Sequence, residues 1–182
     1  MVKSSVASFL LILWATPAIS APIEACIPCH GEKGRSKKQE IPLISGMNAP
    51  YLQSSLEDYA AGRRATEVAI HRTTPLAHYG AIAEHYAKQL WVSPWQIVDQ
   101  KRAARGATWN GGCERCHAQD GRSQMDDNPR LAGQRMGYLR SRIAAFRQGD
   151  KNPPQPKKMR RFIRELSEEQ MEDIIHFYAF KR

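Results

Sequence analysis

The sequence predicts an all-α protein built from two tandem domains, each a small helical bundle. When the chain is shifted against itself by 87 residues, residues 26–62 align with residues 113–149 without a gap. Within each copy the apolar residues recur at helical spacing, and no convincing run of alternating strand residues is present. Two copies of this length indicate a duplicated domain, because a solenoid needs at least three repeats.

Both copies begin with the same five-residue pattern, C-x-x-C-H, at residues 26–30 and 113–117. It uses every cysteine in the chain, namely Cys26, Cys29, Cys113 and Cys116, and it adds His30 and His117. C-x-x-C-H is the attachment signature of c-type haem: the two thiols bond to the porphyrin, and the adjacent imidazole binds the iron as proximal ligand. The sequence therefore predicts two covalently bound haems, each supplying apolar core material that so small a domain lacks.

Two different interpretations of the cysteines are weaker. The paired cysteines of a zinc ribbon usually lie about 15–20 residues apart, whereas 83 residues separate Cys29 from Cys113. Structural disulfides are common in exported chains. Neither a zinc ribbon nor a pair of disulfides explains why a histidine directly follows each pair.

The N-terminus is typical of an exported protein. Lys3 supplies a positive charge, residues 6–15 are apolar, and Ala18-Ile19-Ser20 forms a small-x-small cleavage site. The apolar stretch is shorter than the roughly 20 residues that span a membrane. We therefore expect a cleaved signal peptide over residues 1–20 and a periplasmic protein, with an uncleaved anchor as the alternative.

The mature chain is expected to divide into a first domain over residues 21–92 and a second over residues 93–182. After each haem motif, residues 51–60 and 138–146 place their apolar side chains on one helical face. A closing helix is expected to begin at Ser167, with Gln170 completing a capping box.

The segment after each haem motif also carries a family resemblance. Pro42, Gly46 and Tyr51-Leu52 in the first copy correspond to Pro129, Gly133 and Tyr138-Leu139 in the second. This arrangement resembles the dihaem cytochrome c4 family, which implies two class I cytochrome c domains. The second half is also similar to the cytochrome subunit of flavocytochrome c sulfide dehydrogenases, through residues 113–117, 157–159, 164–166 and 177–179.

A haem iron that transfers electrons normally carries a second axial ligand, Met or His. In the second half Met159 lies in a proline-rich segment that we expect to be a loop, and the resemblance places the methionine ligand of the family there. In the first half the 87-residue shift aligns Arg72 with Met159, whereas counting back from the last helix aligns Glu67 with it. His71 is the plausible ligand in that window. His78, Met47 and an open iron remain possible in its place.

Positive charge is concentrated in the second half. Residues 21–95 hold eight Lys and Arg against seven Asp and Glu, whereas residues 96–182 hold 18 against 11. No nucleic-acid-binding module accompanies this charge. Basic residues flank Met159, namely Lys157, Lys158, Arg160 and Arg161. Such a face steers an acidic redox partner toward the haem edge.

Together these features predict an exported carrier of single electrons, which connects a periplasmic or membrane-bound donor with an acceptor such as a terminal oxidase. A second possibility is the haem subunit of a sulfide-oxidising flavocytochrome, which would need a separate flavoprotein because this chain has no dinucleotide-binding fingerprint. A less favoured possibility is a dihaem thiosulfate dehydrogenase or peroxidase. Some thiosulfate dehydrogenases bind a haem iron through a cysteine, but that ligation is excluded here, because the two haem motifs use all four cysteines and no fifth exists.

Overall fold

The computed structural model describes residues 22–123, 125–148 and 157–182, and this part of the chain is helical without strands. The predicted all-α class is therefore confirmed. The first group of helices is η1 (Ile23–Ala25), α1 (Ile27–His30), α2 (Ala49–Ala60), α3 (Ala69–Thr73), η2 (Leu76–His78) and α4 (Tyr79–Ala87). The second group is α5 (Gln100–Trp109), α6 (Gly111–His117), α7 (Met136–Arg147), α8 (Lys157–Glu165) and α9 (Glu168–Phe180).

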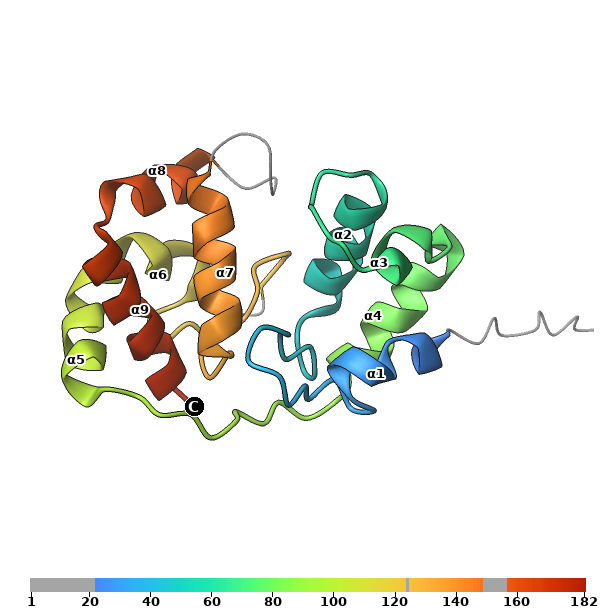
Figure 1. Ribbon diagram of the computed structural model, residues 1–182, viewed down its shortest axis with the longest axis horizontal. Helices are drawn as coiled ribbons and strands as arrows, with labels where there is room; N and C mark the ends of the chain where they lie inside the picture. The colour runs from blue at the N-terminus through green and yellow to red at the C-terminus, as the bar shows by residue number, and fades with distance from the viewer. Residues whose placement is uncertain (1–21, 124, 149–156) are drawn as a thin grey trace, which may run out of the picture.

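The two groups form two bundles that lie side by side and are joined by a long extended segment (Figure 1). This segment runs between the end of α4 at Ala87 and the start of α5 at Gln100, and the expected boundary at residues 92–93 falls within it. The expected signal peptide lies outside the described residues. Within those residues, no helix is both long enough and apolar enough to cross a membrane.

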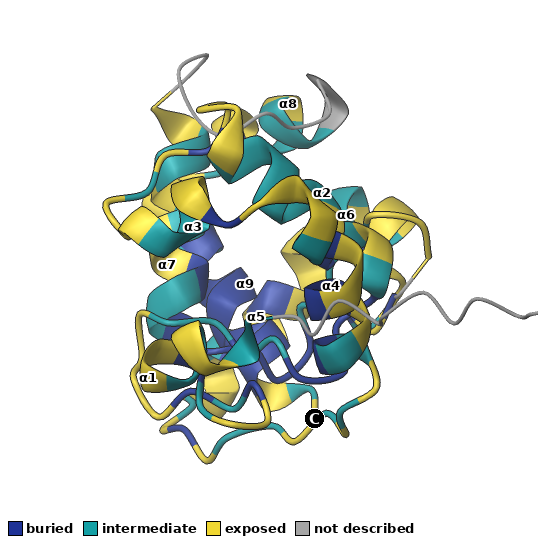
Figure 2. Cartoon of the chain, turned by 90° about the vertical axis from the view of Figure 1, so that its right-hand side faces the viewer, coloured by how far each residue is buried: buried dark blue, intermediate teal, exposed yellow. Residues whose placement is uncertain are grey.

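Helix α9 is the most deeply buried element of the second bundle (Figure 2). Its start confirms the predicted capping box: the Ser167 hydroxyl accepts a hydrogen bond from the Gln170 backbone N–H, and the Gln170 side chain accepts one from the Ser167 N–H. These bonds satisfy amide groups that the helix leaves without internal partners. The capped helix then packs its apolar residues against α5 and α7.

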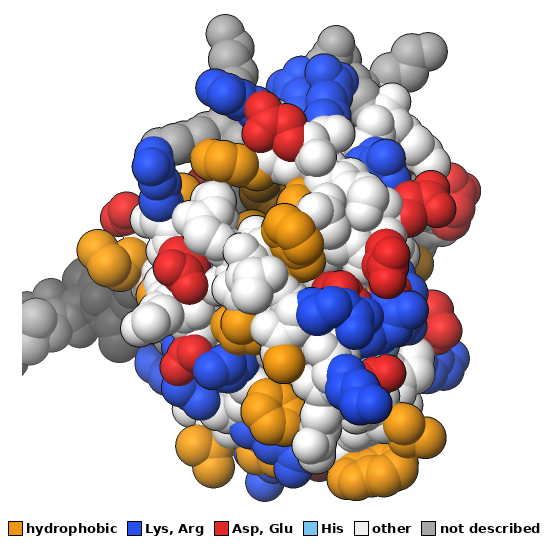
Figure 3. Space-filling model, turned by 90° about the vertical axis from the view of Figure 1, so that its left-hand side faces the viewer, with side chains coloured by type: hydrophobic (Ala, Val, Ile, Leu, Met, Phe, Trp, Pro, Cys, Tyr) orange, Lys and Arg blue, Asp and Glu red, His pale blue; other side chains and the backbone are white. Residues whose placement is uncertain are grey.

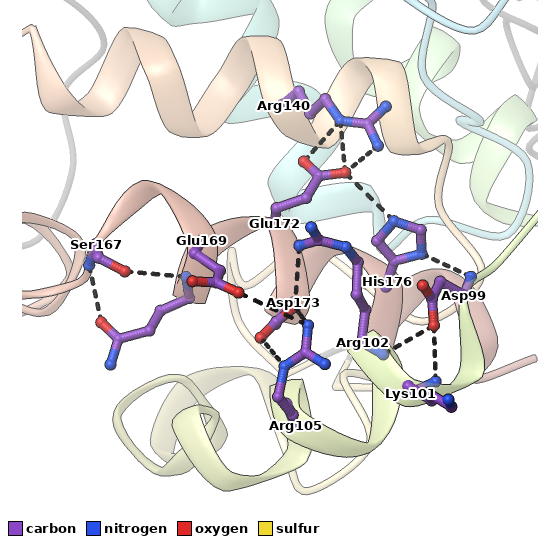
Figure 4. A network of polar contacts seen from close by, with 11 residues as sticks. Asp99, Lys101, Arg102, Arg105, Arg140, Ser167, Glu169, Glu172, Asp173 and His176 are labelled. Atoms are coloured by element: carbon purple, nitrogen blue, oxygen red, sulfur yellow. Dashed lines mark hydrogen bonds and ion pairs between the residues drawn. The ribbon is translucent and has the colours of Figure 1, made fainter.

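A polar cluster holds α5 against α9 (Figure 4). The Asp173 carboxylate is 2 % exposed and accepts hydrogen bonds from the guanidinium groups of Arg102 and Arg105, the latter at 2.8 Å to each oxygen. Burial of a carboxylate is costly unless it is paired and hydrogen-bonded. The two arginines on α5 therefore fix how this helix lies on α9.

The cores of the two bundles repeat the same tyrosine. Tyr86 on α4 and Tyr178 on α9 are 1 % and 2 % exposed, and each lies against a glycine, Gly34 or Gly121, with a φ of +73°. A Cβ at either glycine would meet the tyrosine ring at less than 3 Å, and φ in this region disfavours other residues. The duplication thus extends from the haem motifs to the packing of the final helix in each copy.

One structural expectation is wrong. Met159 does not lie in a loop; it is the third residue of helix α8. The proline pattern misled the prediction because the three prolines end at residue 156, one residue before the helix begins. Those prolines lie outside the described residues.

Candidate haem sites

Each haem motif lies on a short helix, α1 or α6, and the histidine is its last residue. In both copies the next residue turns the chain sharply: Gly31 has a φ of +76° and Ala118 a φ of +61°. The chain therefore leaves the helix directly after the imidazole. This local geometry confines two thiols and one imidazole to about one and a half helical turns, as attachment of a single porphyrin requires.

The proximal imidazoles are buried and oriented in the same way. His30 Nδ1 lies 3.4 Å from the Pro42 carbonyl oxygen, and His117 Nδ1 lies 3.0 Å from the Pro129 carbonyl oxygen. A carbonyl can only accept, so each Nδ1 carries the proton and donates it. The deprotonated Nε2 is then the nitrogen that binds iron, and the contact at Nδ1 fixes the ring orientation.

Burial also sets the charge of these imidazoles. It lowers the pKa of His30 and of His117 below the ordinary value, and the hydrogen bonds to the prolyl carbonyls only partly oppose it. Both rings are therefore neutral near pH 7. Neutral imidazole is the form that binds a metal.

The cysteines show how a porphyrin fits each site. Cys26 and Cys113 are half-buried and contact the hydrophobic cores of their bundles, whereas Cys29 and Cys116 are exposed. None of the four cysteines is paired in a disulfide. Each thiol pair therefore extends from the apolar core to the surface, where the two sulfurs would hold one porphyrin. The residues fit two covalent haems.

The structure brings His71 to the first haem motif. The centroids of the His30 and His71 rings lie 6.1 Å apart, although 40 residues separate them in the sequence. Met47 and His78 are placed differently. Met47 is 2 % exposed in the first core, and its sulfur lies 3.2 Å from the Arg130 backbone nitrogen. His78 ends η2, and its Nδ1 is buried without a hydrogen-bond partner among the described residues.

Sequence reasoning did not identify the polar cluster between the two bundles. Arg64 is 7 % exposed, and its guanidinium donates hydrogen bonds to the Tyr138 hydroxyl at 2.9 Å and to the Ser55 hydroxyl at 2.8 Å. The Tyr51 and Tyr138 hydroxyls, related by the repeat, lie 3.4 Å apart. Burial acts to raise the pKa of Tyr51, but the Arg64 cation and the Tyr138 hydroxyl bring it below the ordinary value. The two Tyr-Leu segments that the repeat relates, at residues 51–52 and 138–139, were the feature of the sequence that could have indicated this cluster.

Two attached haems on two helical bundles define a c-type cytochrome. The cytochrome c family profile matches residues 103–178. The chain is 30 % identical over 165 residues to the thiosulfate dehydrogenase electron acceptor of Thiomonas intermedia, covering 81 % of this chain and 76 % of that protein. It therefore belongs to the family of dihaem cytochromes c that includes these electron acceptors and cytochrome c4.

Further comparisons agree with this family. The chain is 27 % identical over 141 residues to cytochrome c4 of Pseudomonas aeruginosa, covering 71 % of this chain and 69 % of that one. The crystal structure of cytochrome c4 from Pseudomonas stutzeri superposes with a TM-score of 0.75 at 21 % identity, over 88 % of this chain and 95 % of that one. The prediction of a dihaem electron-transfer protein, not an enzyme, is confirmed.

Proposed function

We propose that this cytochrome is an exported, periplasmic acceptor of single electrons from a dehydrogenase, and that it passes them to a further acceptor such as a terminal oxidase. The observation that carries the proposal is the pair of buried, neutral proximal imidazoles, one in each bundle, which would hold two haem irons in one chain. The cysteine pairs and proximal imidazoles would hold two haems, which supply one-electron ferric–ferrous chemistry when bound, and no substrate bond would change. The name of the Thiomonas relative supports a thiosulfate dehydrogenase as donor.

Stopped-flow mixing tests the choice of donor. The oxidised holoprotein is mixed with thiosulfate alone, with thiosulfate dehydrogenase alone, and with both. We expect rapid haem reduction only when both are present, because the cytochrome itself does not oxidise thiosulfate. Reduction by a sulfide-treated flavoprotein, and not by the complete dehydrogenase mixture, would contradict the proposal and favour the flavocytochrome subunit.

The basic start of α8 is the proposed exit toward an acidic acceptor. Arg161 is largely exposed and pairs with Glu165 at 2.8 Å, and Arg160 is half-buried; the side chains of Lys157 and Lys158 are outside the described part. Elsewhere on the outer face of the second bundle, Lys and Arg side chains alternate with Asp and Glu (Figure 3). A local concentration of one sign, as at α8, is what steers a partner.

Reversing the four charges of this segment should therefore slow electron delivery to the acceptor by roughly tenfold or more at low salt, because steering acts on association. Reduction by the donor should stay nearly unchanged. Arg63→Glu is the control, since Arg63 is an exposed arginine of the first bundle that also pairs with a carboxylate, that of Asp58. If the four reversals slowed only the donor reaction, the basic segment would be the entrance instead.

Met159 is the proposed sixth ligand of the second haem. Its half-buried side chain belongs to α8, which packs against α6, the helix that carries the second haem motif. Met159→Ala should open this haem to added cyanide while both haems stay attached. Met125→Ala is the matched control, because Met125 is 72 % exposed in the same bundle. An unchanged absorption spectrum in Met159→Ala would show that the ligand lies elsewhere.

A further inference from the structure

The first bundle differs from the second in the residue that could bind the iron opposite the proximal histidine. No methionine occurs between residues 48 and 124, so this half cannot supply a thioether from the segment that corresponds to α8. The short helix α3 in that segment instead contains His71. What His71 can do depends on its distance from His30, on which ring nitrogen is deprotonated, and on the contacts that orient its ring.

The distance between the two rings fits one iron atom. A metal–imidazole bond is about 2 Å long and a ring nitrogen lies about 1 Å from its ring centre, so two imidazoles on one metal hold their centroids about 6 Å apart. The observed separation of the His30 and His71 centroids is 6.1 Å, with the ring planes tilted by 40°. Ring pairs in direct contact also have centroids between about 4.5 and 7 Å apart, so the assignment needs the contacts that orient the His71 ring as well as this distance.

Two neighbours hold the His71 ring in this position. Tyr59 on α2 stacks on it with centroids 4.6 Å apart and planes 20° from parallel. The Thr66 Oγ1 atom lies 3.1 Å from His71 Nδ1, and the Val68 backbone N–H donates to the same oxygen, also at 3.1 Å. The hydroxyl is thus fixed by the backbone before it meets the imidazole.

The Thr66 contact also occupies His71 Nδ1, so Nε2 is the ring nitrogen left for iron. A hydroxyl can accept from His71 Nδ1–H while donating its own proton elsewhere, which leaves Nε2 deprotonated. The two proximal histidines use prolyl carbonyls for the same purpose. A cation also faces this cluster, since the Arg64 guanidinium lies 4.7 Å from the centre of the Tyr59 ring.

We infer that the first haem is held by two imidazoles, those of His30 and His71, and that Thr66 and Tyr59 are positioning residues for the distal one. This arrangement differs from the second haem, for which a methionine is proposed. Thioether ligation favours ferrous iron and raises the reduction potential. The first haem is therefore the lower-potential centre. The inference concerns iron ligation, so its failure would leave the proposed carrier function intact.

Low-temperature electron paramagnetic resonance of the oxidised holoprotein tests the inference. Wild-type protein should show two low-spin ferric signals, one of the His/His and one of the His/Met type. In His71→Ala the His/His signal should be lost and replaced by a high-spin signal, and added imidazole should restore a low-spin signal. His78→Ala is the control and should keep both wild-type signals. Loss of the signal in His78→Ala, with retention in His71→Ala, would overturn the assignment.

Two further variants give a result even if the alanine variant loses its haem. His71→Met should remain low-spin and convert the first signal to the His/Met type, with a raised potential. Thr66→Val should keep six-coordinate iron but change the potential of the first haem, and Thr66→Ser should restore it, because serine keeps the hydroxyl. A wild-type potential in Thr66→Val would show that Thr66 does not act on the ligand.

Discussion

Gly106→Ala should destabilise the second bundle by about 3 kcal/mol, at the upper end of what overpacking usually costs. Gly106 lies on α5 where this helix crosses α9, and it is buried there. A Cβ at this position would overlap the Asp173 carbonyl oxygen and lie 2.8 Å from the Phe177 Cβ. Neither neighbour is the far end of a flexible side chain, so the two helices must move apart.

That movement would also disturb the ion pairs beside the crossing. Asp173 accepts from Arg102 and Arg105 across the same contact (Figure 4). Urea unfolding, followed by haem absorption, should give a lower midpoint for Gly106→Ala. Gly111→Ala is the matched control, because Gly111 is also helical and a Cβ there meets nothing within 4 Å. Equal midpoints in the two variants would show that α5 and α9 do not approach so closely.

Gln134→Ala should have an effect of similar or larger size, because the Gln134 side chain joins the two bundles. Its amide nitrogen donates to the Leu43 carbonyl at 3.0 Å, and its amide oxygen accepts from the Leu43 N–H at 2.9 Å. Gln134 is 1 % exposed and Leu43 equally buried. Removing the amide leaves a buried donor and a buried acceptor unpaired, each at a cost of about 1–3 kcal/mol.

Thermal unfolding of the holoprotein measures this loss, and Gln53→Ala is the control because Gln53 is exposed and bonds to Glu57 within its own helix. We expect Gln134→Ala to lower the melting temperature clearly and Gln53→Ala to leave it nearly unchanged. We also expect Gln134→Ala to loosen the neighbouring contacts between bundles, such as the Tyr138 N–H to Gln39 carbonyl bond of 2.8 Å. If both variants melted alike, water would be replacing the amide, and Gln134 would not be what joins the bundles.

Features encoded locally were the ones that the sequence predicted well. The haem motifs and the capping box at Ser167 each depend on residues within a few positions of one another, and the structure contains the corresponding helices. Alignment of the repeat restricted the search for a distal ligand to a six-residue window, and the structure brings His71, from that window, beside His30.

Features that depend on distant residues were not predicted. Gln134 meets Leu43 across 91 positions, and Arg64 meets Tyr138 across 74. Nothing in the pattern of either segment marks a glutamine or an arginine for burial, since both residue types are mostly exposed. Met159 was expected in a loop because prolines precede it, but the helix begins directly after the last proline, where a helix can start without a clash.

A stepwise redox titration of the oxidised holoprotein, monitored by low-temperature electron paramagnetic resonance, tests the central claim most directly. Each haem accepts one electron, so the ferric signals of two unlike haems should disappear in two separate one-electron steps. As the potential is lowered, the His/Met signal of the second haem should vanish first and the His/His signal of the first haem last, so that electrons flow downhill from the first bundle to the second. If the His/His signal disappeared at the higher potential, or both signals together, the account of two unequal centres in series would be contradicted.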